Sequence, residues 1–318
     1  MFYIFVRMKD KNIDKKNVLV TGGNSFIGKK VLNYLAQDNK LSVLTTVRDL
    51  SIIKKIDNVH YYEVKNYFTY TKWADLLDNI DTLIHTAGIT APPKELPSGM
   101  DSGLSVMMHV NRDITAKIAN EAVKSDVNRI IYLSSLSVYR GKVPVKHITL
   151  ETPVKNETIY AQSKYAGEVA INEACSSTNL EFVFLRPSMV VGKDTKGNFY
   201  SMANIFGKIG FSPFGAFKSH YPIVKIDTLV EFIYKAVMVK TIQSGVYLIA
   251  EKEFLTLPEV ISSVAELSNK RVKHLFIPKK LLALLFAILQ KKELFNHITS
   301  GRKIDTDRTW QIINTEIH

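Results

Sequence analysis

A tyrosine and a lysine four residues apart, Tyr160 and Lys164, are the side chains in this sequence best suited to chemistry. On a helix, residues four apart lie on one face, so a phenol would stand beside an ammonium. The neighbouring cation would favour phenolate over phenol and lower the pKa of the tyrosine toward neutral pH. A serine pair, Ser134 and Ser135, lies upstream, and the Ser135 hydroxyl could hold a substrate oxygen against the phenol. These residues predict proton transfer to or from a carbonyl or alcohol oxygen.

The same spacing occurs three times among the 14 tyrosines of the chain, and its context separates the three matches. Tyr61 and Tyr221 lie in stretches rich in β-branched or aromatic residues, which predict strands. Four residues along a strand span about 13 Å, so those tyrosines could not touch their lysines. Tyr160 instead opens a run of small and polar residues that predicts a helix over residues 160–175.

Short apolar runs alternate with helical patterns along most of the chain. This alternation predicts an α/β fold, a doubly wound parallel sheet of the Rossmann type with helices on both faces. Residues 17–190 would form the dinucleotide-binding domain, with residues 222–242 returning to it, after an N-terminal extension of residues 1–16. Residues 191–221 and 243–318 would form a smaller C-terminal substrate-binding lobe. The expected strands are 17–21, 41–47, 82–85, 129–133 and 182–185, and the expected helices include 29–37, 111–123 and 160–175.

Composition narrows the class of protein. The chain has 318 residues, 46% of them apolar, which is enough for a sizeable core. Its single cysteine, Cys175, excludes an internal disulfide and fits a reducing compartment, so we expect a cytoplasmic protein. No cluster of residues has metal-ligand spacing, so no metal site is expected. The formal net charge of +12 comes from scattered basic residues, which favours phosphate-bearing small molecules over nucleic acid.

A strongly apolar run, residues 281–289, has lysines on both sides. It is too short to span a bilayer. We favour a buried or interdomain helix, and a helix lying on a membrane surface, hence a peripheral membrane contact, stays open as the alternative.

A glycine-rich turn follows the first expected strand. In this position a dinucleotide pyrophosphate docks on the N–H groups and positive dipole of the following helix. Gly22 would allow the tight turn, and Gly28 would allow close packing of helix on strand. Ser25 stands at the middle position of the glycine spacing, where its Cβ crowds the pyrophosphate but its hydroxyl could bind a phosphate oxygen.

Cofactor choice is expected to depend on the end of the second strand. An acidic residue there bonds the adenosine ribose and favours NAD. Here Arg48 follows the strand without a preceding acid, which favours the 2′-phosphate of NADP. The alternative is NAD, with Arg48 in solvent and Asp49 bound to the ribose.

Several motifs in order resemble the extended short-chain dehydrogenase/reductase family, the NAD-dependent epimerase/dehydratase group. The matching stretches run from about residue 18 to 308. They include the glycine turn, His85-Thr-Ala-Gly88, Val110-Asn111, the serine strand ending at Tyr139, Tyr160 with Lys164, and Arg186-Pro-Ser188. The resemblance implies Tyr160, Lys164 and Ser135 as catalytic residues. It also implies that the cofactor is bound by Gly22, Ser25, Phe26, Ile27, Gly28, Arg48, Thr86, Ala87, Gly88, Asn111, Tyr160, Lys164, Pro187 and Ser188.

Further stretches are similar to members of this group that act on UDP-activated sugars. They include Lys196-Gly-Asn-Phe199, residues 226–230 and Gly301-Arg-Lys-Ile-Asp305. The resemblance implies a UDP-sugar substrate bound by Ser135, Asn198 and His220, with His220 or Lys218 replacing a commonly found arginine. Val64-Lys65 stands where an aspartate commonly meets the adenine. The family resemblance also implies a homodimer that packs through residues 111–123 and 160–175.

The predicted reaction is NAD(P)-dependent hydride transfer at C4 of a UDP-linked hexose or N-acetylhexosamine. Because Arg48 favours an exchangeable NADPH, we prefer a UDP-4-keto-sugar reductase of surface-polysaccharide precursor synthesis. A UDP-hexose or UDP-hexosamine 4-epimerase is the alternative. A non-catalytic dinucleotide sensor of the same fold is the second alternative, although such a protein would be expected to lose Tyr160 or Lys164.

Overall fold

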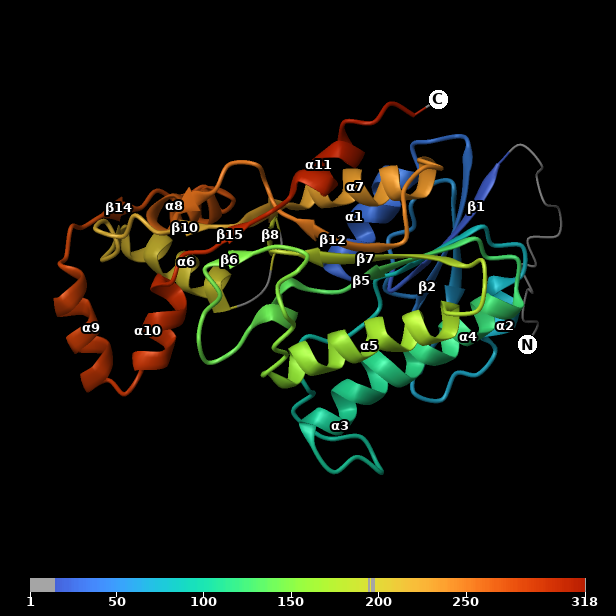
Figure 1. Cartoon of the computed structure of the whole chain (residues 1–318), viewed down its shortest axis with the longest axis horizontal. Coiled ribbons are helices and arrows are strands. Elements are labelled where there is room, and N and C mark those ends of the chain that lie inside the picture. Colours follow the sequence, from blue (N-terminus) through green and yellow to red (C-terminus); the bar gives the residue numbers. More distant parts are fainter. Residues whose placement is uncertain (1–14, 194, 196–197, 318) are drawn as a thin grey trace.

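The computed structural model describes residues 15–193, 195 and 198–317 and has the α/β architecture that the sequence predicts (Figure 1). Most of the predicted N-terminal extension lies outside the described residues, and its last residue, Lys16, already begins the first strand.

Seven strands form one sheet in the order β12-β7-β5-β4-β1-β2-β3, and all neighbours run parallel. The strands read as short apolar runs because helices cover both faces of the sheet. The order changes direction between β1 and β4, which is where ligands bind in open α/β sheets. The strands are β1 (Lys16–Thr21), β2 (Leu41–Val47), β3 (Val59–Glu63), β4 (Thr82–His85), β5 (Arg129–Leu133), β7 (Glu181–Pro187) and β12 (Gly245–Ile249).

Two helical layers enclose the sheet (Figure 1). One contains α1 (Phe26–Leu35), α7 (Ile226–Met238) and α11 (Asp307–Ile313). The other contains α2 (Trp73–Leu77), α3 (Gly103–Met108), α4 (Ile114–Lys124) and α5 (Ile159–Cys175). A separate apolar cluster fills the space between the sheet and each layer, so the sheet is held rigidly from both sides.

The predicted strands are all present, and two predicted helices begin differently from expectation. The first helix begins at Phe26, three residues before the predicted start, because the Ser25 side chain caps it. The helix expected at 111–123 begins with a π-helical turn, His109–Asp113, before α4. Of the other two tyrosines with a lysine four residues on, Tyr61 lies in β3 and Tyr221 in a short strand, as predicted.

The boundary near residue 243 differs from the prediction. Residues 245–249, which the sequence assigned to the lobe, form β12 at the edge of the main sheet. The chain later returns as α11, where Thr309 Oγ1 donates to Leu248 O (2.7 Å) and Trp310 Nε1 to Ala250 O (3.1 Å). These long-range contacts, invisible in the local pattern, attach both segments to the dinucleotide-binding domain.

The smaller lobe extends from one end of the sheet (Figure 1). Its helices are α6 (Asn198–Ile209), α8 (Leu257–Glu266), α9 (Lys279–Ile288) and α10 (Lys292–Thr299). Its strands are only two or three residues long and occur in pairs. The pairs at and near the lobe are β8 (Met189–Val191) with β11 (Ile223–Lys225), β9 (Phe211–Ser212) with β14 (Lys273–His274), β10 (His220–Tyr221) with β13 (Leu255–Thr256), and β6 (His147–Ile148) with β15 (Lys303–Ile304).

The apolar run 281–289 forms α9, and the preferred prediction that this helix is buried is wrong. Leu282 is its only buried residue, and most of its other leucines face outward. Among the described residues, every helix is too short or too polar to cross a membrane.

Candidate active site

A cavity of about 620 Å³ lies where the carboxyl ends of the central strands meet the lobe. It brings together residues that are far apart in the sequence, from the glycine turn to α8. Most predicted site residues line it, namely Ser25, Phe26, Ile27, Thr86, Gly88, Ser135, Tyr160, Lys164, Pro187 and Ser188.

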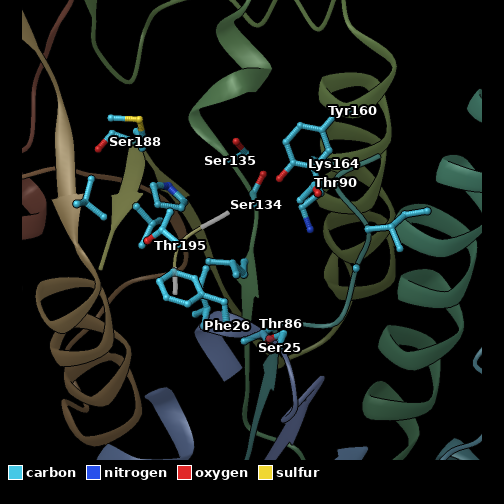
Figure 2. Close-up of a pocket in the computed structure, with 18 of the residues that line it drawn as sticks. Ser25, Phe26, Thr86, Thr90, Ser134, Ser135, Tyr160, Lys164, Ser188 and Thr195 are labelled. Carbon is cyan, nitrogen blue, oxygen red and sulfur yellow. The ribbon is translucent and has the colours of Figure 1, made fainter. Parts of the chain in front are cut away.

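The predicted catalytic residues meet in this cavity. Tyr160 and Lys164 lie in the first turns of α5, which the Thr158 side chain caps by accepting from Ala161 N at 3.2 Å. Ser135 follows the end of β5, and its hydroxyl is hydrogen-bonded to the Tyr160 side chain. Figure 2 shows Ser135 and Tyr160 facing one another, with Ser25 and Thr86 toward the other end of the cavity.

The serine pair divides into two roles. Ser134 is buried, and its hydroxyl already donates to Glu168. The same carboxylate forms an ion pair of 2.5 Å with Arg186, whose guanidinium also donates to Tyr139 Oη. This buried network joins α5 to β7 beneath the cavity. It leaves Ser135, the serine that the resemblance implied, as the one hydrogen-bonded to the tyrosine.

Lys164 is enclosed by aromatic and loop residues. Its Nζ lies 4.4 Å from the centroid of the Tyr132 ring. A Cβ placed on Gly88 would come within 3.4 Å of the same Nζ, so glycine lets this loop approach the lysine closely. The result is a buried ammonium with one nearby carboxylate, that of Glu168, one turn along the helix.

The titration of this pair differs from the sequence prediction. Burial raises the pKa of Tyr160, and the hydrogen bond from Ser135 opposes that rise. Burial lowers the pKa of Lys164 to about 7, while the charge of Glu168 acts in the opposite direction. The prediction that the lysine lowers the pKa of Tyr160 is therefore wrong for the protein alone, because taking both groups out of water disfavours both charged forms.

The glycine turn has the geometry expected of a phosphate cradle. Gly22 has φ +77°, a conformation that a side chain would strain. A Cβ on Gly28 would lie 2.3 Å from Gly22 O, so the helix can approach the strand only with glycine there. Gly28 N donates to Ser25 Oγ at 2.9 Å, and the hydroxyl proton of Ser25 is left to point elsewhere. The N-terminus of α1 is thus open to an anion.

A second cavity of about 310 Å³ continues from the glycine turn past the end of β2. Arg48 and Lys65 both line it, and its described lining contains no carboxylate. Asp49 instead accepts from the backbone and hydroxyl of Ser51, at 2.8 and 2.6 Å. Of these two cations only Arg48 was predicted to bind the cofactor. Lys65 was noted from the sequence only as a departure from the family pattern.

The residues of the two cavities fit a nicotinamide dinucleotide. Gly22, Arg48 and Ala87 line the second cavity, while Ser25, Thr86 and Gly88 line both. Ser188 Oγ is buried beside the main cavity and has no hydrogen-bond partner among the described residues, so it can bond a polar group of a ligand.

Asn111 has a different position from the one expected. It is buried and lines neither cavity. Its amide accepts from Ile89 N at 3.0 Å and donates to Ile89 O and Ser163 Oγ, both at 2.9 Å. It therefore fixes the loop after Gly88 against α5 and does not face the cofactor cavity.

Two arginines that the sequence analysis did not assign lie on the substrate side. Arg140 lines the main cavity just after Ser135 in the chain. Burial, followed by the charge of Arg140, lowers the pKa of Arg302. Tyr221 Oη, on which the charge of Arg302 acts, is buried without a hydrogen-bond partner in the part of the chain that the structure describes. Of these three groups Arg140 lines the cavity, and it offers an anionic ligand a cation there, while Arg302 and Tyr221 lie outside the lining.

Two of the predicted substrate residues, His220 and Asn198, are not placed in the cavity by the described part of the structure. His220 is exposed and lines neither cavity, but Arg302 N donates to its carbonyl at 2.8 Å. This bond brings the backbone of Arg302 next to the segment 218–221 in which the sequence predicted a cation. The motif of Arg302, Gly301-Arg-Lys-Ile-Asp305, was the signal that could have found it. Asn198 begins α6, but its side chain lies outside the described part, as do Lys196 and Gly197.

Comparison with known proteins identifies the class. The profile of the NAD dependent epimerase/dehydratase family matches residues 18–248. The chain belongs to this family. It is therefore an enzyme of an NAD-dependent class, and the predicted enzyme class, fold and nicotinamide dinucleotide are confirmed at that level.

Characterised relatives cover most of the chain. A UDP-glucose 4-epimerase from Vibrio cholerae is 24% identical over 297 residues, 92% of this chain and 88% of the relative. An epimerase from Escherichia coli O157:H7, N-acetyl-alpha-D-glucosaminyl-diphospho-ditrans,octacis-undecaprenol 4-epimerase, is 25% identical over 270 residues, 82% of this chain and 75% of the relative.

Solved structures support the fold. MoeE5 in complex with UDP-glucose and NAD superimposes with a TM-score of 0.69 at 19% identity, covering 95% of this chain and 93% of that one. A UDP-glucuronic acid 4-epimerase from Bacillus cereus in complex with NAD gives 0.69 at 16% identity, with 95% and 91% covered.

Proposed function

We propose that this protein is a 4-epimerase of a UDP-linked hexose or N-acetylhexosamine. The observation that carries the proposal is one cavity lined both by a Ser135–Tyr160–Lys164 group and by the cation Arg140, whose charge also acts on Arg302 outside the lining. The first group handles a proton at a sugar oxygen, and the second binds a diphosphate. The relatives named above, which act on diphosphate-linked sugars, support the same substrate class.

The chemistry that a nicotinamide dinucleotide would supply in these cavities is reversible hydride transfer at C4 of the sugar. The protein's own residues move the proton. Tyr160 as phenolate removes the proton from the C4 hydroxyl while the hydride leaves, so a C4 ketone forms. After the sugar has turned, the phenol gives the proton back to the developing alkoxide, and no net oxidation results.

Ser135 and Lys164 adjust that proton transfer. The Ser135 hydroxyl donates a hydrogen bond to Tyr160 or to the C4 oxygen, which stabilises negative charge on either. Lys164 with a bound proton stabilises the phenolate, and the Glu168 carboxylate favours that protonated state. Burial lowers the pKa of Lys164 to about 7, so burial alone disfavours its charge near neutral pH. Cofactor groups in contact with this lysine would also affect its protonation.

The diphosphate of the substrate would lie between Arg140 and Arg302. The described chain offers neither guanidinium an ion pair, so each retains its charge for a ligand. The unpartnered Tyr221 hydroxyl would complete the hydrogen bonds to a phosphate oxygen.

The epimerase is tested by incubating purified protein with UDP-glucose or UDP-N-acetylglucosamine without added cofactor. Conversion to the corresponding 4-epimer, followed by chromatography, is the expected result. Nucleotide released by denaturing the protein should be NAD in about equal amount to the enzyme. A protein that is folded and loaded with NAD, yet converts neither sugar, would count against this proposal.

A second candidate is the UDP-4-keto-sugar reductase that the sequence favoured. Arg48 and Lys65, in a cavity without a described carboxylate, are suited to the 2′-phosphate of NADPH. The relatives are epimerases, and we therefore rank the reductase second. Oxidation of NADPH by a UDP-4-keto-sugar, with no 4-epimerisation, would reverse this order.

A homodimer through α4 and α5 and a cytoplasmic location stay predictions.

A further inference from the structure

Helix α9 has an apolar face that the protein does not cover. Leu281, Leu284, Leu285 and Ile288 follow a spacing of three and four residues, so they share one side of the helix. Their exposed fractions are 57%, 59%, 48% and 70%, and Leu289 just beyond the helix is 56% exposed. Phe276, on the segment leading into α9, is 78% exposed.

The opposite side of α9 is fixed to the lobe. Leu282 is buried in the cluster that includes Leu257 and Phe295, and Phe286 packs against that cluster. The Phe286 and Phe295 rings lie 5.2 Å apart. The helix therefore has one apolar side for its own core and a second that points outward, whereas a surface helix normally has one.

The surroundings of this face are strongly basic. Between residues 270 and 292 the chain has seven lysines and arginines and no aspartate or glutamate. Six of the seven are exposed, namely Arg271, Lys273, Lys279, Lys280, Lys291 and Lys292. A pair of exposed lysines stands at each end of α9, so cations border the apolar face at both ends.

The exposed apolar and basic side chains described above are concentrated at one end of the molecule. Figure 1 shows α9 and α10 at the extremity of the lobe, away from the main sheet. Of the 19 exposed large apolar side chains in the described residues, 11 belong to the lobe between residues 205 and 289. The dinucleotide-binding domain shows no comparable helix in the part that the structure describes.

We propose that α9 and residues 275–278 form a docking surface for an anionic lipid bilayer. An amphipathic helix with leucines on one side and lysines at its borders lies in the plane of such a surface, with the apolar side among the acyl chains. The ten residues of α9 are too short to span a bilayer, so the contact is peripheral. The proposal rests on this surface alone and does not depend on the substrate.

The basic border argues for lipid over a second copy of the chain. A symmetric dimer through this face would bring the same lysines of two copies together, and their repulsion would oppose the apolar contact. Anionic headgroups instead neutralise them. Because the lobe also provides Tyr200 and Val264 to the main cavity, docking would hold the substrate side of the enzyme at the bilayer.

The test is co-sedimentation of the full-length protein with vesicles of phosphatidylcholine, with or without phosphatidylglycerol. The unmodified protein should bind the anionic vesicles, and added salt should weaken the binding. L284Q/I288Q should lower the partition coefficient at least roughly tenfold, and K280Q/K291Q should lower it to a similar extent only on anionic vesicles.

Matched controls come from the dinucleotide-binding domain. Ile52 is 69% exposed, close to the value of Ile288, and Lys54 and Lys55 are exposed nearby. I52Q and K54Q/K55Q should bind vesicles like the unmodified protein, and all variants should keep its melting temperature.

Three results would overturn the proposal. One is failure of the unmodified protein to bind anionic vesicles at low salt. Another is an equal loss of binding in the controls. The third is a concentration-dependent dimer in light scattering that L284Q/I288Q abolishes, because the face would then be occupied by a second copy.

Discussion

The wall formed by β5, α5 and β7 and the lobe formed by α6, α8, α9 and α10 differ in how their side chains are held. In the wall, polar groups are buried and paired, as in the Ser134–Glu168–Arg186 network. In the lobe, strands are two or three residues long and apolar side chains remain exposed. The wall fixes reacting groups, and the lobe presents surfaces to ligands.

The difference follows from what surrounds each region. A seven-stranded sheet enclosed by two helical layers leaves side chains few alternative positions. The lobe has one apolar cluster and no large sheet in its described residues. We therefore expect substitutions in the wall to change catalysis and stability steeply, and those on the outer lobe to change binding.

The largest expected effect is on turnover. Tyr160→Phe removes the proton-transfer group but keeps the ring, so kcat should fall roughly 10²- to 10⁴-fold while the cofactor stays bound. Steady-state kinetics measure kcat, and the absorbance of nucleotide released from the protein measures the bound cofactor. Tyr61→Phe, at another match to the same spacing, is the control. Near-normal turnover in Tyr160→Phe would contradict the assigned role.

The next effect is on the stability of the wall. Glu168→Gln leaves the buried Arg186 guanidinium without its carboxylate, which should cost roughly 3–5 kcal/mol of unfolding free energy in urea. The matched control is Glu121→Gln, since Glu121 pairs with Lys124 at the surface and should contribute about 1 kcal/mol or less. Equal losses in the two variants would mean that the buried network does not stabilise the wall.

The two sides of α9 provide a comparison within the lobe. Leu282→Ala empties a position that is 3% exposed and should cost roughly 2–5 kcal/mol. Leu284→Ala, two residues away at 59% exposure, should change the unfolding free energy by about 0.5 kcal/mol or less. Similar losses from both would show that the outer face is packed in solution.

Substrate binding should respond to the lobe side of the cavity. Arg302→Met removes one of the two cations proposed to bind the diphosphate, so KM for a UDP-sugar should rise roughly 10- to 100-fold with a smaller change in kcat. Arg308→Met, whose guanidinium lies over the Tyr247 ring away from the cavity, is the control. A fall in kcat at unchanged KM would place Arg302 outside the diphosphate site.

The last expected effect is a change of stability with pH. Burial lowers the pKa of Lys164 to about 7, so between about pH 7 and its unfolded value of 10.5 the unfolded chain binds a proton that the folded protein lacks. Without cofactor, the stability of the unmodified protein relative to Lys164→Met should therefore rise with pH across this window and be flat below it. Urea unfolding at several pH values measures this, and a difference that falls with rising pH would contradict the depressed pKa.

Local patterns were sufficient for much of the fold and for the reacting residues. The apolar runs predicted the strands, because a buried parallel strand must be apolar on both faces. The glycine turn and Tyr160–Lys164 could be located from spacing, since residues close in sequence determine a turn or a helix face. Arg140 and Arg302 could not, because the charge of one acts on the other only when segments about 160 residues apart in the sequence fold together.

The sequence alone determined the family and the parallel sheet and predicted the proton-transfer group, because each depends on short-range patterns. Only the tertiary structure decided the pKa directions of Tyr160 and Lys164, which depend on burial that no local motif shows. It also placed Gly245–Ile249 in the main sheet and turned α9 outward. Both outcomes depend on which distant segment covers an apolar face, and that is settled by packing.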